Sequence, residues 1–153
     1  PVVNIVNQLG WQATLWDHRP AYLEQSEFNI CDKKRKVRAE NTEPKEYSDF
    51  DAGVVMTHNI ESDTIYLSKA LSANVNYIGL LGPVGRRDKL LKENKLTFEQ
   101  VQGQVYGPIG LDLGGRSTQA IELSITAQIQ QQLSKQYAHQ QYRAWRQISP
   151  EPY

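Results

Sequence analysis

The chain has 153 residues, of which 39% are apolar and 22% charged, and its 17 basic and 17 acidic side chains cancel to a net charge of zero. This length suits one domain with its own core, and the composition is that of a folded chain. Balanced charge gives no long-range attraction to nucleic acid or to an anionic membrane. No apolar run approaches the ~20 residues that span a bilayer, and no secretory leader is visible. We therefore expect a cytoplasmic protein that binds neither nucleic acid nor membrane. A single cysteine excludes an internal disulfide framework and a multi-cysteine zinc site.

The chain opens with the pattern of a short helix followed by a strand. Residues 2–9 place apolar side chains on one helical face, with Pro1 suited to the first turn and Gly10 to the stop. Residues 12–16 then read as a short strand that ends at Asp17.

The next segment is less regular. A brief helical turn is expected over residues 21–26, an edge strand over 36–39 and a loop over 41–49. The basic run at 33–36 has two interpretations: it keeps an exposed strand edge from pairing with other chains, or it binds an anion.

The middle of the chain alternates strands and helices. Residues 51–56 form the strongest strand pattern, with a continuous apolar stretch typical of a strand buried on both faces. A helix over 60–73, a strand over 76–81, and helices over 86–94 and 97–102 follow, with Thr97 as the cap of the last.

A glycine-rich segment and a long helix complete the domain. Residues 106–116 contain four glycines and predict irregular backbone, and Ser117 then caps a helix. That helix repeats an apolar residue every four positions, at Ile121, Ile125, Ile129 and Leu133. The pattern fails after residue 135, so we expect a Rossmann-like domain over 1–135 and a Gln-rich, aromatic tail over 136–153.

Strands separated by helices predict an α/β fold, a three-layer sandwich with a mostly parallel sheet. In such sheets, ligands bind at the carboxyl ends of the strands. Six residues follow predicted strands in this way: Asp17, His18, Thr57, His58, Asn59 and Gly82.

Asp17 and His58 each have more than one interpretation. Asp17 could accept hydrogen bonds from a ribose, Arg19 could instead pair with a 2′-phosphate, or the two could form a local pair at a solvated strand end. His58 could contact a polar ligand, bind a metal or be structural. The spacing of these residues does not choose between the alternatives.

The glycine-rich segment suggests a ligand-binding loop. Glycines let backbone N–H groups approach a ligand, and a loop before a helix can present them to an anion. The candidates here are Gly107, Gly110, Asp112, Gly114 and Arg116, with Arg116 available to pair with phosphate. A tight structural connection is the alternative.

Four segments together resemble the C-terminal Rossmann domain of the XdhC/CoxI family of xanthine dehydrogenase accessory proteins. They are LGW…DHRP, AGVVMTH, YIGLLG and GPIGLDLG, in order over residues 1–130. The resemblance implies an accessory domain, rather than an enzyme, that helps a molybdenum hydroxylase to mature. It also implies a nucleotide or pterin-type ligand, either NAD(P) or the nucleotide form of the molybdenum cofactor, and no metal ligands in this domain.

Two departures from the family pattern matter. Members begin this domain with a hydrophobic strand and a glycine-rich turn, which are missing before Pro1. The segment from Gly82 to Arg87 is spaced differently from the family's usual pattern, although Arg86 could still reach a phosphate. Alternative functions are an NAD(P)-dependent oxidoreductase fragment and a scaffold with a decayed ligand site.

A missing central strand predicts a repair. The strand at 12–17 could close directly onto the strand at 51–56, or a second copy could supply an element. On this ground we expect a homodimer.

Overall fold

The computed structural model describes the backbone of residues 2–148 and the side chains of residues 2–136. The helices are α1 (Val2–Gln8), α2 (Pro20–Leu23), α3 (Pro44–Tyr47), α4 (Ile60–Ser72), α5 (Val84–Glu93), α6 (Phe98–Val101) and α7 (Thr118–Ile148). Two 3-10 turns, η1 (Ser26–Phe28) and η2 (Ala39–Asn41), flank the strand β2. The strands are β1 (Thr14–Asp17), β2 (Lys33–Lys36), β3 (Ala52–Val55), β4 (Tyr77–Leu80) and β5 (Val105–Tyr106).

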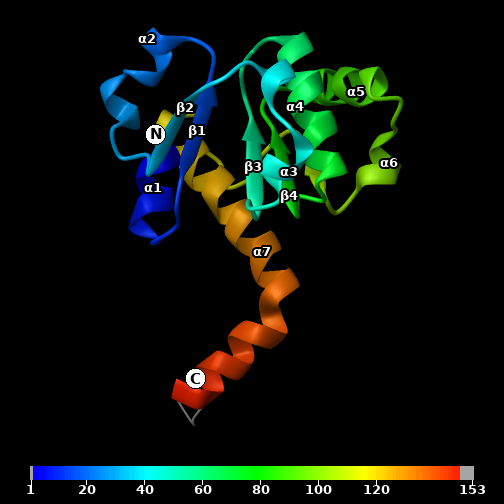
Figure 1. Ribbon diagram of the computed structural model, residues 1–153. Coiled ribbons are helices and arrows are strands. Elements are labelled where there is room, and N and C mark those ends of the chain that lie inside the picture. The colour runs from blue at the N-terminus through cyan, green and yellow to red at the C-terminus, as the bar shows by residue number, and fades with distance from the viewer. Residues whose placement is uncertain (1, 149–153) are drawn as a thin grey trace.

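Every paired strand of the described chain is parallel to its neighbour, which confirms the predicted α/β class. β1 pairs with β2, and β3, β4 and β5 pair in that order, so the strands form two sheets. Figure 1 shows the two sheets side by side, with β1 and β3 at their facing edges. Within the described residues no strand lies between β1 and β3, and these two do not pair. The expected gap is therefore present, and direct closure of the two strands, one of the two repairs considered, is wrong.

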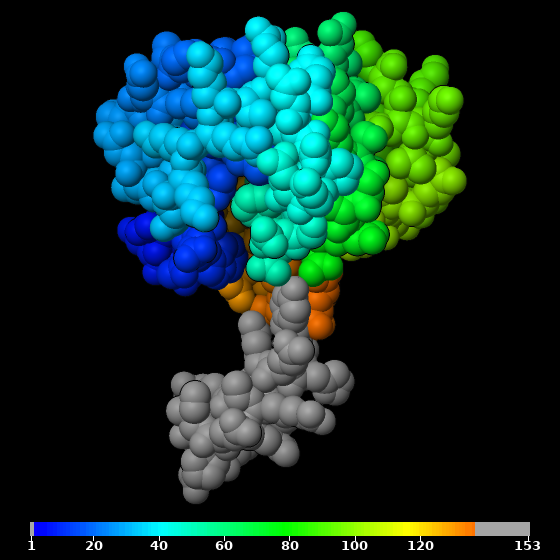
Figure 2. Space-filling model, in the orientation of Figure 1, coloured from blue at the N-terminus to red at the C-terminus, as the bar shows by residue number. Residues whose placement is uncertain are grey.

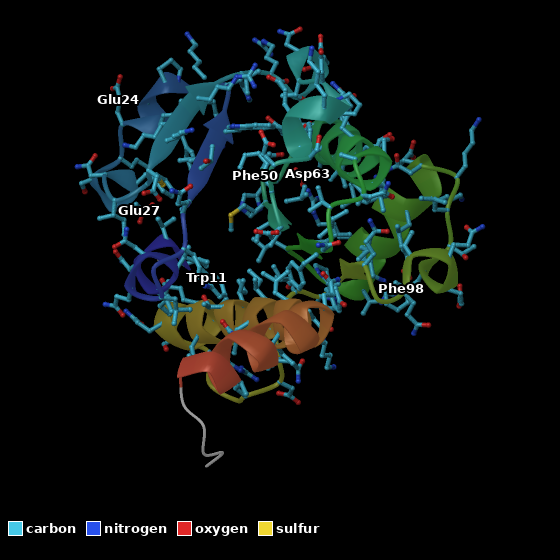
Figure 3. The ribbon with its side chains drawn as sticks, turned by 60° about the horizontal axis from the view of Figure 1, so that its bottom comes forward. Trp11, Glu24, Glu27, Phe50, Asp63 and Phe98 are labelled. Carbon is cyan, nitrogen blue, oxygen red and sulfur yellow. The ribbon has the colours of Figure 1, made fainter. Side chains whose placement is uncertain are left out.

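Helices cover both faces of the three-stranded sheet, because alternate strand residues point to opposite faces. Ile78 and Leu80 of β4 face a core shared with α4 and α5, whereas Tyr77 faces Ile125 and Ile129 of α7. α1 packs beside α7 on this second face. Figure 3 shows the arrangement from below, with α7 lying under the strands and Trp11 beside it. The predicted three-layer architecture follows from this division of the core.

The long helix α7 is capped as predicted, with the amide of Ala120 donating to Ser117 Oγ at 3.1 Å. Ile125 and Ile129 are buried, but Ile121, which was expected on the same face, is 47% exposed. Its neighbour Glu122 is only 8% exposed, because a four-residue spacing exceeds the 3.6-residue turn and carries Ile121 off the buried face. The helix continues to Ile148, and Figure 1 shows its last turns leaving the body of the domain.

Three boundary predictions were wrong. The basic run itself forms β2, in place of the predicted strand at 36–39, because it pairs with β1. The predicted loop at 41–49 contains α3, which Pro44 opens and a reciprocal Glu43–Glu46 capping box holds. Tyr106, predicted irregular, is in β5.

No helix in the described part of the chain combines the length and hydrophobicity needed to cross a membrane.

Candidate functional site

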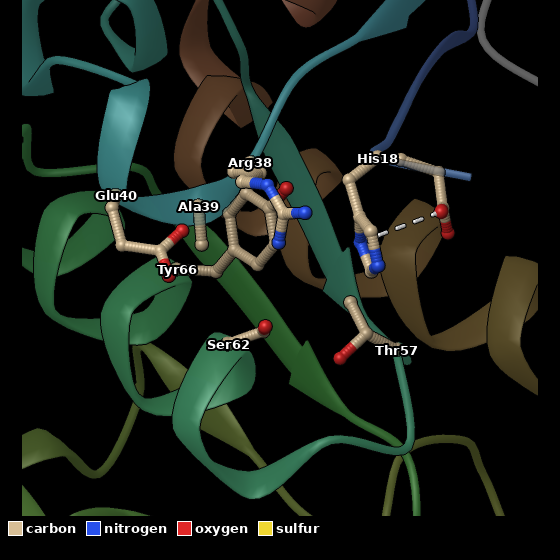
Figure 4. Close-up of a pocket in the computed structure, with 8 residues that line it drawn as sticks. His18, Arg38, Ala39, Glu40, Thr57, Ser62 and Tyr66 are labelled. Atoms are coloured by element: carbon tan, nitrogen blue, oxygen red, sulfur yellow. Dashed lines mark ion pairs between the residues drawn. The ribbon is translucent and has the colours of Figure 1, made fainter. Parts of the chain in front are cut away.

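A small, open pocket lies at the carboxyl ends of β1 and β3, against the first turns of α4. Figure 4 shows the lining side chains, which come from the ends of β1 and β3, from the region of η2 and from α4. It is lined by Asp17, His18, Arg38, Ala39, Glu40, Thr57, Ser62 and Tyr66. The position is the one at which parallel α/β sheets bind ligands. The pocket is small and open to solvent, so it can contact only part of a nucleotide-sized molecule.

Asp17, the last residue of β1, contributes a carboxylate to the pocket lining. Its side chain is 5% exposed and holds Arg19 through two hydrogen bonds, from Nε at 2.9 Å and from Nη2 at 2.8 Å. The backbone amide of Arg19 also donates to the carboxylate at 2.8 Å. Burial opposes ionisation of Asp17, but these bonds outweigh it, and the pKa of Asp17 lies below its ordinary value.

The structure therefore contains the local Asp17–Arg19 pair, one of the three interpretations of these residues. It does not block the other two. A carboxylate has about four acceptor positions, so Asp17 can still accept a hydroxyl. Arg19 is 46% exposed and stacks over the Tyr22 ring at 4.5 Å, which leaves its guanidinium open to an anion.

Thr57 forms the opposite wall and is held by Asp63 of α4. The Thr57 amide and hydroxyl both donate to Asp63, whose other carboxylate oxygen accepts from Arg86 of α5. Arg86 therefore forms an ion pair with the buried carboxylate of Asp63, which is 1% exposed. Because of this pairing, Arg86 does not line the pocket. It holds Asp63, which in turn holds Thr57.

His58 and Asn59 follow Thr57 on the loop into α4. Asn59 caps the helix by accepting from the Ser62 amide at 2.9 Å. His58 has a φ of +63°, an uncommon conformation for a side chain other than glycine, and it is exposed. Neither residue lines the pocket.

The third wall comes from η2 and α4. Lys69 of α4 donates to the carbonyls of Ala39 and Glu40, at 2.8 and 3.1 Å, and also to that of Thr42. This lysine fixes the turn that presents Arg38 and Glu40. Beneath them, burial raises the pKa of Tyr66 to about 12, so its hydroxyl remains a hydrogen-bond donor at neutral pH.

The glycine-rich segment lies apart from this pocket, since none of its residues contributes to the lining. Gly110 is clipped to α7: its amide donates to Gln128 Oε1 at 2.9 Å and its carbonyl accepts from Nε2 at 3.2 Å. The Gly107 carbonyl accepts from Arg87 at 2.9 Å.

The remaining candidates of this segment are exposed. Gly114 has a φ of +79°, and a Cβ there would meet open space. Asp112 and Arg116 are exposed as well. Gly82 ends β4 with a φ of +113°, where a Cβ would meet Arg86.

Of the thirteen residues predicted from sequence, the structure brings three into one pocket, namely Asp17, His18 and Thr57. Arg19 and Arg86 are bonded to the carboxylates of Asp17 and Asp63. Sequence reasoning missed Arg38, Glu40, Ser62 and Tyr66 in the lining and Asp63 behind it. The capped start of α4 was a usable signal for Ser62 and Asp63. Nothing local in the sequence marked η2, because the distant Lys69 and the burial of Ala39 in the core hold it in place. No group of three metal-ligating side chains occurs among the described residues.

Parallel strands between two helical layers, with a pocket at the strand carboxyl ends, define a Rossmann-type domain. The chain matches the family model of the XdhC Rossmann domain over residues 1–129, and it belongs to that family. It is also similar to a protein of Bacillus subtilis described as a probable xanthine dehydrogenase subunit. The two are 30% identical over 130 residues, which is 84% of this chain and 38% of the relative.

A solved structure has a similar fold. The crystal structure of a xanthine dehydrogenase from Bacillus halodurans superposes with a TM-score of 0.73 at 26% identity. The match covers 88% of this chain and 39% of that one. The chain therefore spans about two fifths of the length of both relatives.

Proposed function

We propose that this domain is the nucleotide-binding part of an accessory protein that acts in the cytoplasm on the maturation of a xanthine-dehydrogenase-type molybdenum hydroxylase. Membership of the XdhC Rossmann family and the names of the two relatives support the association. The observation that carries the ligand class is the position of Asp17. A buried carboxylate at the end of a parallel strand, beside an open pocket, suits the hydroxyls of a ribose.

The residues present fit one end of a nucleotide. Asp17 would accept from a ribose hydroxyl, while Arg19 or Arg38 would pair with a phosphate if the ligand carries one there. Thr57 and Ser62 supply hydroxyl groups on the facing wall. The described residues contain no group of side chains that could hold a metal ion.

Ligand-dependent stability tests this proposal. Thermal unfolding would be followed with NAD, NADP, CTP, GTP and molybdopterin. A ligand at a hundred times its Kd adds about 2.7 kcal/mol, which corresponds to roughly 5–10 °C for a domain of this size. Asp17→Ala should reduce the shift at saturating and subsaturating ligand. Asp112→Ala, outside the pocket, is the matched control and should keep it.

The same measurements distinguish the alternative functions, which are a scaffold with a decayed site and an oxidoreductase fragment. No shift with any of these ligands at millimolar concentration would favour a scaffold with a decayed site. Oxidation of bound NADH by an added acceptor would favour the oxidoreductase fragment. A shift that Asp112→Ala abolishes and Asp17→Ala leaves intact would move the site to the glycine-rich segment.

For the assembly we propose a homodimer. The support is the interruption between β1 and β3, which do not pair within the described residues and which an element of a second copy would bridge. Light scattering coupled to size exclusion tests it, since a mass near 17.5 kDa at all micromolar concentrations would contradict a dimer.

A further inference from the structure

The strand β2 lies at an edge of its sheet, with β1 on one side and, within the described residues, no strand on the other. The Val37 amide, directly after β2, donates to the carbonyl of Asp17 at 3.0 Å, so the odd-numbered residues here direct their backbone groups toward β1. Because this direction alternates along a strand, Lys34 and Lys36 direct their N–H and C=O groups away from β1. The edge therefore presents donors and acceptors in the arrangement that a further strand would pair with.

This edge of the sheet is open to solvent. Three of the four residues of β2 are exposed and the fourth is partly buried, whereas all four residues of β4, which has a strand on each side, are buried. Figure 2 shows the sky-blue atoms of this part of the chain at the surface of the face in view. An exposed strand edge of this kind is a template for strand addition.

The four basic side chains of β2 divide into two that the domain uses and two that it does not. Arg35 pairs with Glu46 of α3 at 2.5 Å, and Lys34 donates to a backbone carbonyl of α2 at 2.9 Å. Lys33 and Lys36 are exposed, and within the described residues neither side chain forms a hydrogen bond or an ion pair. These two lysines are three positions apart, so they flank the edge from opposite faces of the sheet.

The charges on this edge decide which strands it can accept. A second copy of β2 would place lysine against lysine, and like charges directly opposite each other destabilise a strand pair. Opposite charges in the same positions stabilise the pair. The lysines thus exclude self-association through this edge and favour a strand with acidic side chains.

We propose that β2 binds an extended acidic segment of a partner protein, which adds to the β1–β2 sheet as a third strand. The backbone groups of Lys34 and Lys36 select a polypeptide, because an extended chain supplies both acceptors for their N–H groups and donors for their C=O groups. The phosphates of a nucleic acid or a lipid supply acceptors alone. Lys33 and Lys36 select acidic side chains three positions apart, which lie on opposite faces of an added strand.

The docking edge is separate from the candidate pocket. No residue of β2 lines that pocket, although the strand leads into Arg38 and η2, which do. A segment bound at the edge would therefore leave the pocket open, and the proposal does not depend on a nucleotide.

Binding of a synthetic peptide tests the proposal. The probe is a fluorescent, threonine-rich peptide with two glutamates three positions apart, and its affinity is measured by fluorescence anisotropy at low salt. The double variant Lys33→Glu with Lys36→Glu should weaken binding by at least about tenfold, because two attractive pairs become repulsive. This variant should instead prefer a peptide with lysines in place of the glutamates. Lys89→Glu with Lys92→Glu, which changes exposed lysines of α5, is the matched control and should keep the affinity.

Amide hydrogen exchange shows whether a ladder forms. With the peptide bound, exchange at the amides of Lys34 and Lys36 should slow, whereas the Arg35 amide, which already faces β1, should change little. Two further peptides carry N-methyl groups at alternate residues, one in each register, and keep the same charge. At least one of them should bind about tenfold more weakly, because it cannot donate to the carbonyls of β2.

Three results would overturn the proposal. Equal affinity of the unmodified and charge-reversed chains would exclude recognition by the two lysines. Equal affinity of both N-methylated peptides and the unmethylated one would exclude a ladder. A single-stranded oligonucleotide that binds more tightly through the same lysines, without slowing exchange at the two edge amides, would assign them to a phosphate backbone. Thermal unfolding of both double variants is the control for folding, and none of these measurements involves the nucleotide pocket.

Discussion

Arg86 of α5 donates from Nη2 to Oδ2 of Asp63 on α4, while Oδ1 of the same carboxylate accepts from the amide and hydroxyl of Thr57. One side chain, only 1% exposed, thus joins two helices to the carboxyl end of β3. A buried charge of this kind is tolerated because it is both paired and hydrogen-bonded. The wall of the candidate pocket depends on it.

Removing that carboxylate should strongly destabilise the domain. Asp63→Ala leaves Arg86 and the Thr57 amide without their acceptor, and we expect a loss of about 3 kcal/mol in the free energy of unfolding. Urea denaturation would measure it. Asp88→Ala is the control, because Asp88 is 56% exposed in its pair with Arg87 and should cost less than about 1 kcal/mol. Equal losses in the two variants would contradict the role given to Asp63.

Asp17 should make stability depend on pH in the acid range. Its pKa in the folded domain is below the ordinary value of 3.8, because the hydrogen bonds and charge of Arg19 outweigh burial. Between the two pKa values the unfolded chain binds more protons, so stability rises with pH there. The contribution is complete above the unfolded-state pKa and is lost as the pH falls through the folded-state pKa.

Asp17→Asn should remove this contribution. We expect about 1 kcal/mol less stability than the unmodified chain at pH 7, with the difference shrinking as the pH falls below about 4. Urea denaturation across that range would show it. Asp49→Asn changes an exposed aspartate and serves as the control. A difference that stays constant with pH would exclude the linkage.

The two glycines of the segment after β5 should respond differently to substitution. Gly110 has a φ of +105°, and a Cβ there would clash with Ser124 Oγ on α7. We expect Gly110→Ala to cost about 3 kcal/mol, from backbone strain and overpacking together. Gly114→Ala meets only open space and should cost about 1 kcal/mol, for its φ of +79°. Thermal unfolding of both variants would rank them, and the reverse order would refute this explanation.

Trp16 should hold the two sheets together. It contacts Tyr47 of α3 and Phe50 of the segment before β3, and Arg35 of β2 stacks over it at 5.3 Å. Trp16→Ala should cost about 3 kcal/mol in unfolding free energy, whereas Trp16→Phe keeps an aromatic ring and should cost about half as much. The backbone amides of β2 should also exchange their hydrogens with solvent faster in the alanine variant. If the β2 amides were unaffected, the two sheets would be held by other contacts.

Local signals in the sequence were enough to place most elements. The apolar run at 51–56 predicted β3, the caps at Thr97 and Ser117 predicted the starts of α6 and α7, and alternating strands and helices predicted the parallel α/β class. Signals that depend on partners were misleading. The strand was predicted at 36–39 but lies at Lys33–Lys36, because the basic run becomes a strand only through pairing with β1. Ile121 is exposed because the buried face of α7 passes through its neighbour Glu122.

The same division applies to the candidate site. The sequence determined that polar residues such as Asp17 and Thr57 follow strands, since a strand's end is encoded locally. Only the tertiary structure decided that these two share a pocket, that Asp63 supports one wall, and that Lys69 fixes η2 as another. These contacts join residues far apart in the chain, and no local pattern encodes which distant group will satisfy a buried charge or carbonyl. The unpaired edges of β1 and β3 are of the same kind, because a ladder is a property of two strands and not of either one.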